Sequence, residues 1–218
     1  MPEFAYEQSA DQMVSKFGFT AAFLRDAVVA RAAAAARSYA GGLYPPAASG
    51  MARWMHSVAY TREALSALGY EPNDTDLISK VIHRERGLAI VCAAGNPVTG
   101  VPFMLARKYP TTKWPKGERT AVAVARNNEQ MTFFDELDED EEPIRPLETW
   151  LLLQYADREE VRAELSLPAA INHRGFITDW HQRYILPPLS NDGGIADEPI
   201  IDDGDEEGGG IVVPVEPR

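Results

Sequence analysis

Three histidines and two carboxylates form the only catalytic constellation that the sequence offers. His83 and Glu85 are two residues apart, Asp179 and His181 repeat that spacing, and His173 lies eight residues before His181. Residues two apart in a strand share one face. Histidine and carboxylate ligands can hold a divalent metal that activates water, as in a phosphodiesterase or nuclease. We therefore keep a metal-dependent hydrolase or nuclease as an alternative function, beside the simpler interpretation of a solvated polar face.

A basic stretch with aromatic residues runs from Arg107 to Arg126. It holds six bases and one acid, and two prolines interrupt the part that carries the rings. Cations neutralise phosphates and rings stack on bases, so this composition is typical of a nucleic-acid contact loop. The residues that we expect to make the contact are Arg107, Lys108, Tyr109, Lys113, Trp114, Lys116 and Arg119. The alternative is a solubilising surface loop whose Trp114 packs into the body of the protein.

A short hydrophobic peptide, Gln130-Met131-Thr132-Phe133-Phe134, follows the basic stretch. It resembles the peptide with which bacterial DNA polymerases, mismatch-repair proteins and other replication factors dock on the sliding clamp. That pattern is glutamine, an aliphatic residue, a small or acidic residue, then leucine and phenylalanine. The resemblance implies that Gln130 is the polar anchor, Met131 the aliphatic position, and Phe133 with Phe134 the plug that fills a pocket. Met131 and Phe133 depart from the usual leucines. The alternative is that both phenylalanines pack into the protein's own core.

Other common signatures are absent from the sequence. It has no phosphate loop of the GxxxxGKS or GxxxxGKT kind, and no GxGxxG, GxSxG, HExxH or CxxC motif. The single cysteine, Cys92, excludes an internal disulfide, and its apolar neighbours indicate a buried, inert thiol. We therefore expect no cofactor, and a metal only under the hydrolase alternative.

The acidic residues are concentrated in two segments. Residues 135–142 hold seven acids and residues 192–207 hold eight, with no base in either. These fifteen are part of 33 acids, so 18 remain against 21 Lys and Arg, and the rest of the chain is about +3 although the whole is −12. Acidic segments rich in Gly and Pro bury too little apolar surface to become ordered. We expect a linker at 135–147 and a disordered acidic tail at 190–218 that competes with DNA for the basic loop.

The first third of the sequence predicts helices. Thr20 is a suitable N-cap for a helix that continues through an alanine-rich run to Ala40. A second helix is expected after Ser49, with Gly69 just beyond its end. Its expected apolar stripe follows helical spacing and comprises Met51, Trp54, Met55, Val58, the stem of Arg62, and Leu65.

The remainder of the sequence predicts strands, at 78–85, 88–93, 103–108, 120–126, 150–155, 161–167 and 184–186. Arg162, Glu164 and Ser166 alternate with apolar residues, which indicates a hairpin strand with one wet face. Because the helices precede the strands, we expect an α+β fold with a mainly antiparallel sheet. Its helical region is 1–70, and the mainly β region at 71–189 belongs to the same domain.

These features favour a non-enzymatic accessory or adaptor protein of DNA metabolism. The short peptide recruits it to a sliding clamp, and the basic aromatic loop contacts nucleic acid. A third possibility is a protein-interaction or inhibitor protein whose acidic segments mimic the DNA backbone. The sequence has no apolar run of ~18 residues and no secretory signal pattern, so we expect a bacterial cytoplasmic protein without a membrane partner.

Overall fold

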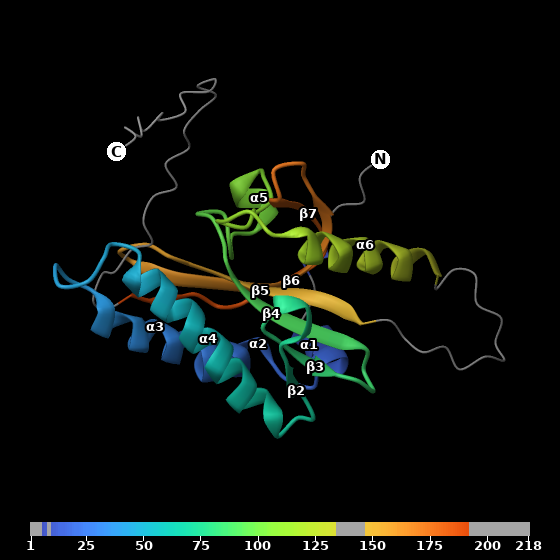
Figure 1. Ribbon diagram of the computed structural model, residues 1–218, viewed down its shortest axis with the longest axis horizontal. Helices are drawn as coiled ribbons and strands as arrows, with labels where there is room; N and C mark the ends of the chain where they lie inside the picture. The colour runs from blue at the N-terminus through green and yellow to red at the C-terminus, as the bar shows by residue number, and fades with distance from the viewer. Residues whose placement is uncertain (1–5, 8–9, 134–146, 192–218) are drawn as a thin grey trace, which may run out of the picture.

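The structure is a computed structural model that describes residues 6–7, 10–133 and 147–191, and its elements form three layers (Figure 1). One face of a mixed sheet is covered by the N-terminal helices, and the other by the two helices that follow β4. The helices are α1 (Ala10–Phe17), α2 (Ala21–Leu24), α3 (Arg31–Ala36), α4 (Ala48–Ser66), α5 (Phe103–Ala106) and α6 (Glu118–Phe133). A π-helical stretch, Arg25–Ala30, joins α2 to α3, and short 3-10 turns lie at Arg37–Tyr39 and Thr75–Leu77.

The sheet has the order β1-β7-β6-β5-β4-β3-β2, with the short strand β8 also paired to β6. Its strands are β1 (Tyr6–Glu7), β2 (Glu71–Asn73), β3 (Lys80–His83), β4 (Leu88–Ala94), β5 (Glu148–Ala156), β6 (Glu160–Ile171), β7 (Ile177–Ile185) and β8 (Leu189–Ser190). The pairs β4–β5 and β1–β7 are parallel, and the other described pairs are antiparallel. The α+β class and the mainly antiparallel sheet are thus confirmed.

Two apolar clusters hold the layers together on opposite faces of the sheet. The larger cluster joins the N-terminal helices to the sheet through Phe17, Trp150 and Tyr184, whose rings meet with centroids 4.9–5.6 Å apart. The smaller cluster joins α6 to the sheet through Val124 and Leu153. Alternate residues of β5 pack into the two clusters because successive side chains of a strand point to opposite faces of the sheet.

The predicted hairpin is present as β5 and β6, with Ala156 opposite Val161, and Thr20 caps α2 by accepting a hydrogen bond from the Phe23 backbone N–H at 3.0 Å. Two expected strands are wrong, because 103–108 contains α5 and 120–126 lies within α6. Thr120, Val122 and Val124 alternate with small residues as in a strand. In the helix, however, Val124 and Asn127 are three residues apart on the face that meets the sheet, and this packing overrides the strand propensity of valine.

The apolar stripe expected on α4 is also wrong in its first half. Met51, Trp54 and Met55 are 62%, 46% and 50% exposed. The buried face comprises Ala52, Arg53, Ser57, Thr61 and Leu65. Small and polar side chains let the helix approach the strands closely and form hydrogen bonds there, for example between Thr61 Oγ1 and Cys92 Sγ at 3.4 Å. The large apolar side chains of the first two turns are consequently left outside.

The expected wet face of β6 is buried. Glu164 and Ser166 are completely inaccessible to solvent, as is Arg183 on the neighbouring strand β7. Arg183 Nε donates to Glu164 Oε1 at 3.0 Å, Ser166 Oγ donates to the same oxygen at 2.7 Å, and the Gly100 N–H donates to Glu164 Oε2 at 2.8 Å. A charged side chain can lie in a buried position when its partners satisfy it, so polar alternation alone did not identify the solvent side.

Among the described helices, none has the length and apolar character needed to cross a bilayer.

Candidate functional site: a cationic cavity lined by tryptophans

The basic aromatic loop is anchored to the sheet on both sides of Trp114. The Lys113 N–H donates to the Ala94 carbonyl at 2.8 Å, which places Lys113 at the carboxyl end of β4. The Lys116 N–H donates to the Gly175 carbonyl at 2.7 Å, in the turn between β6 and β7. Gly175 has φ +83°, and a Cβ there would lie 2.8 Å from the Lys116 carbonyl oxygen, so the close approach requires glycine. These bonds fix where the loop presents its side chains.

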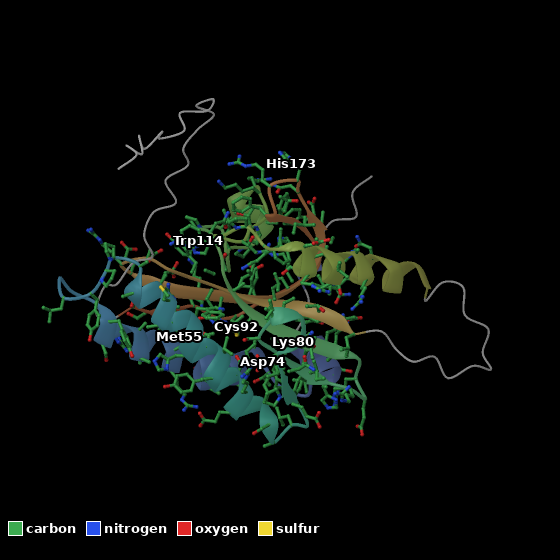
Figure 2. All side chains as sticks on the ribbon, viewed as in Figure 1. Met55, Asp74, Lys80, Cys92, Trp114 and His173 are labelled. Atoms are coloured by element: carbon green, nitrogen blue, oxygen red, sulfur yellow. The ribbon has the colours of Figure 1, made fainter. Side chains whose placement is uncertain are left out.

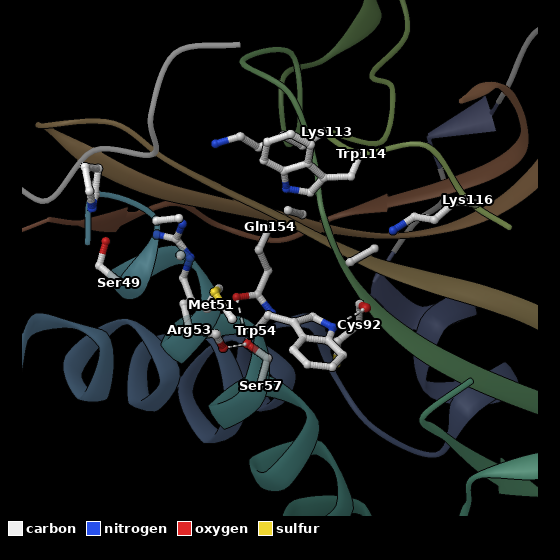
Figure 3. Close-up of a pocket in the computed structure, with 15 residues that line it drawn as sticks. Ser49, Met51, Arg53, Trp54, Ser57, Cys92, Lys113, Trp114, Lys116 and Gln154 are labelled. Atoms are coloured by element: carbon white, nitrogen blue, oxygen red, sulfur yellow. Dashed lines mark hydrogen bonds between the residues drawn. The ribbon is translucent and has the colours of Figure 1, made fainter. Parts of the chain in front are cut away.

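A cavity of about 480 Å³ lies between this loop and the first half of α4 (Figure 3). Strands β4 and β5 contribute its inner wall, at the end where β4 stops. The lining residues are Pro46, Ala47, Ser49, Gly50, Met51, Arg53, Trp54, Ser57, Cys92, Ala93, Ala94, Lys113, Trp114, Lys116 and Gln154. We call this space the cationic cavity, because Arg53, Lys113 and Lys116 line it and none of the described lining residues is acidic.

Two tryptophans enter the cationic cavity from opposite walls. Trp54 comes from α4, and its Nε1–H donates to the Cys92 carbonyl at 3.1 Å, which fixes the indole against the end of β4. Trp114 comes from the loop and is 58% exposed, with Lys113 Nζ 5.5 Å from the centroid of its ring. In the view of Figure 3, the Trp114 ring lies above Gln154 and the Trp54 ring lies below it. The cavity therefore combines cations with exposed aromatic faces.

A buried hydrogen-bonded floor closes the cavity toward the core. Ser57 Oγ donates to the Arg53 carbonyl at 2.7 Å, and Gln154 Nε2 donates to Ser57 Oγ at 2.9 Å. Both side chains are buried, so the bond joins α4 to β5 across the interface. The floor is polar but internally satisfied, which gives the cavity a fixed shape.

Desolvation acts on two of the cations. Burial lowers the pKa of the Arg53 guanidinium to about 10 and also lowers the pKa of the Lys116 ammonium. Desolvation raises the free energy of a cation, and an anion bound nearby would offset that cost. The electrostatics therefore favour an anionic ligand.

The structure brings together only part of the predicted loop contact. Lys113, Trp114 and Lys116 line the cavity. Arg107, Lys108 and Arg119 are exposed outside it, and Tyr109 packs on Phe103 with ring centroids 4.8 Å apart. Tyr109 belongs to the margin of the smaller apolar cluster, so it acts in packing.

Sequence reasoning missed Arg53 and misplaced Trp54. The sequence did contain a signal, because Arg53, Ser57 and Thr61 recur every four residues and mark one helical face. The larger apolar side chains of the neighbouring face mask this signal, because hydrophobicity alone assigns them to the core.

The residues of the metal alternative are dispersed. His83 ends β3, while Asp179 and His181 lie on β7, four strand positions away or about 19 Å at ~4.8 Å per strand. Glu85 lies in the turn after β3, so it does not share a strand face with His83, and His173 lies in an exposed turn. Figure 2 shows His173 well apart from Lys80, the first residue of β3. No group of three or more metal-ligating side chains occurs within the described part of the chain.

His181 and Cys92 have local structural partners. His181 Nε2 lies 2.7 Å from Asn128 Oδ1, which links β7 to α6. Cys92 is buried, and desolvation raises the pKa of its thiol to about 11, as expected for an inert cysteine.

The clamp-like peptide lies at the end of α6. Residues 130–133 form the last turn of that helix, whereas their side chains and residue 134 lie outside the described residues. The acidic segments at 135–142 and 192–207 are also outside them. Whether the phenylalanines are exposed, and whether the acids line a face, therefore stay predictions.

Comparison with known proteins adds no assignment. No protein family, curated protein or solved structure matches the chain, so its candidate function depends on the cationic cavity itself.

Proposed function

We propose that the protein is an accessory protein of DNA metabolism that contacts nucleic acid through the cationic cavity. The observation that carries the proposal is the meeting of Lys113, Trp114 and Lys116 with Arg53 and Trp54 around one space. Two segments distant in sequence, the first half of α4 and the loop before α6, supply these groups.

Each group suits one part of a nucleic acid. Lysine and arginine neutralise phosphates and release condensed counterions, which makes affinity depend on salt. Exposed tryptophan faces accept bases by stacking, which needs no particular base sequence. A surface of this kind binds nucleic acid without recognising a particular base sequence, which agrees with the role of an accessory factor.

Binding of a labelled oligonucleotide at several salt concentrations tests this proposal. If three cations each neutralise a phosphate, log Kd rises with log salt with a slope of about 2 for a single strand. Raising salt from about 50 to about 200 mM then weakens binding roughly 20-fold. Lys113→Gln is expected to reduce the slope by about 0.7.

Arg84→Gln is the matched control. Arg84 is exposed in the turn before β4, at the opposite end of that strand from the cavity, and its removal costs one positive charge as well. The proposal requires the control to keep the parental slope. An equal decrease of the salt slope in Lys113→Gln and Arg84→Gln would indicate only a general effect of net charge.

Recruitment to a sliding clamp is the second part of the proposal. It is supported by the pattern Gln130-Met131-Thr132-Phe133-Phe134 and by its position at the end of a helix, where a final turn opens at little cost. We expect micromolar binding to the clamp that is lost in Phe133→Ala/Phe134→Ala. Circular dichroism and thermal unfolding check that the variant remains folded, and absence of binding by the parental protein refutes recruitment.

A further inference from the structure

The two tryptophans of the cationic cavity suit an aromatic ligand of limited size. Trp54 is fixed by its hydrogen bond to the Cys92 carbonyl, so its exposed face is preorganised. Trp114 faces the same space from the loop (Figure 3). Preorganised rings need little ordering when a ligand stacks on them, which favours binding.

We propose that the cationic cavity takes one unpaired nucleotide of a single strand, with its base against the tryptophans and its phosphates at Lys113 and Lys116. This inference rests on the proposed nucleic-acid contact and deepens it by naming the ligand. It distinguishes a single strand from a duplex, which the charge of the loop alone does not do.

The shape of the site argues for an unpaired base. Its volume of about 480 Å³ lies within the range of ~300–1,000 Å³ that is usual for small-molecule sites. In a duplex both faces of a base are covered by its neighbours, so the base enters a cavity and stacks on a ring there only if it leaves the duplex stack. Leaving the stack costs a few kcal/mol in paired DNA and much less in a single strand.

The positions of the cations agree with a strand that continues beyond the cavity. Lys113 and Lys116 flank Trp114 in the chain, so phosphates on either side of a stacked base can meet them. Outside the cavity, Arg107, Lys108 and Arg119 are exposed on segments that continue from the same loop. A free mononucleotide would use only the cavity, whereas a strand also gains these outer contacts.

The first turn of α4 adds a further group for a phosphate. Ser49 and Gly50 lie in this turn and line the cavity beside Arg53. Backbone N–H groups and the helix dipole make such a turn favourable for negative charge. Together with Arg53, this places an anion-attracting wall opposite the two lysines.

Four ligands separate the proposal from its alternatives when their binding to the full chain is measured by tryptophan fluorescence and by anisotropy. They are oligothymidylate, an abasic strand of the same length, a duplex of that length, and thymidine monophosphate. Oligothymidylate is expected to bind at least about fivefold more tightly than the abasic strand or the duplex, because the stacking of one base on an aromatic ring contributes about that much at the lower end of its usual range. Thymidine monophosphate is expected to bind more weakly still.

Variants of Trp114 test whether this ring provides the discrimination. Trp114→Ala is expected to bring the affinity for oligothymidylate close to that for the abasic strand, while leaving the abasic affinity unchanged. Trp114→Phe is expected to keep most of the preference, because a smaller ring still stacks. Leu105→Ala, which shortens another exposed apolar side chain, is the matched control and should have no effect.

The outcomes distinguish this inference from the proposed function. Equal, salt-dependent binding of the oligothymidylate and abasic strands overturns the unpaired-base site and leaves the nucleic-acid contact standing. Equal affinity for thymidine monophosphate and oligothymidylate overturns the proposal that the ligand is part of a single strand, and indicates a free nucleotide instead. Failure to bind any of the strands at low salt overturns the nucleic-acid function, and the inference with it.

Discussion

The buried pair Glu164–Arg183 and the cationic cavity are two regions that hold cations, and they are built differently. Around Arg183, a carboxylate accepts from the guanidinium, a serine hydroxyl and a backbone N–H, and neither charged side chain is exposed. The cavity instead gathers three cations and two partly exposed rings, with no acid among its described lining residues.

This difference indicates a structural role for the first region and supports the binding role that we propose for the second. A buried charge with its counter-charge in place contributes to a defined fold, and removal of one partner leaves the other charge buried and uncompensated. Cations that line an open space stabilise the fold little and attract anions from solution. Variants in the first region should therefore change stability, and variants in the second should change binding.

The largest effect is expected from Glu164→Ala. It leaves Arg183 buried without its carboxylate, and we expect the free energy of unfolding to fall by about 3–5 kcal/mol. Urea denaturation followed by circular dichroism measures the loss. Glu160→Ala on the same strand removes a partly exposed partner of Arg162 and should cost less than about 1 kcal/mol. Similar losses in both variants would contradict the distinction.

A smaller loss of stability is expected from Asn127→Ala. The Asn127 amide donates to the carbonyls of Thr149 and Pro168 and accepts from the Thr149 N–H, and it joins α6 to the sheet. Its loss leaves buried backbone groups unpaired, at a cost of about 1–3 kcal/mol in the same urea experiment. Asn128→Ala, one residue along on an exposed position, is the control and should cost less.

Lys116→Gln tests whether a cation that lines the cavity contributes to binding or to stability. Because desolvation already disfavours the Lys116 ammonium, its replacement should change the free energy of unfolding by no more than about 0.5 kcal/mol. The salt slope of single-strand binding should nevertheless decrease by about 0.7. Parallel unfolding and binding titrations check both values, and a large loss of stability with an unchanged slope would assign Lys116 to the fold.

The smallest effect is expected from Met55→Gln, which tests the unusual exposure of the first half of α4. Met55 is half exposed, so the free energy of unfolding should change by only about 0.5 kcal/mol or less. Leu65→Ala in the last turn removes a completely buried side chain and should cost about 2–5 kcal/mol. Thermal unfolding of the two variants measures the two losses of stability. A larger loss in Met55→Gln than in Leu65→Ala would contradict the prediction.

Local patterns in the sequence were sufficient for much of the fold. The cap at Thr20, the end of α4 near Gly69, and the β5–β6 hairpin follow from residue preferences that act over a few positions. The sequence also singled out Lys113, Trp114 and Lys116, because cations interleaved with rings and prolines are typical of a nucleic-acid contact loop. The structure places all three around the cationic cavity, and their contact with nucleic acid stays a prediction.

Only the tertiary structure decided which of these residues meet and which sides are buried. Arg53 and Trp54 precede Lys113 and Trp114 in the sequence by 60 residues, and no local pattern joins them before α4 packs beside the end of β4. Likewise, Glu164 is buried because Arg183 on the neighbouring strand supplies the counter-charge. Burial and site formation depend on contacts between distant segments, and these contacts override the average preferences of the individual residues.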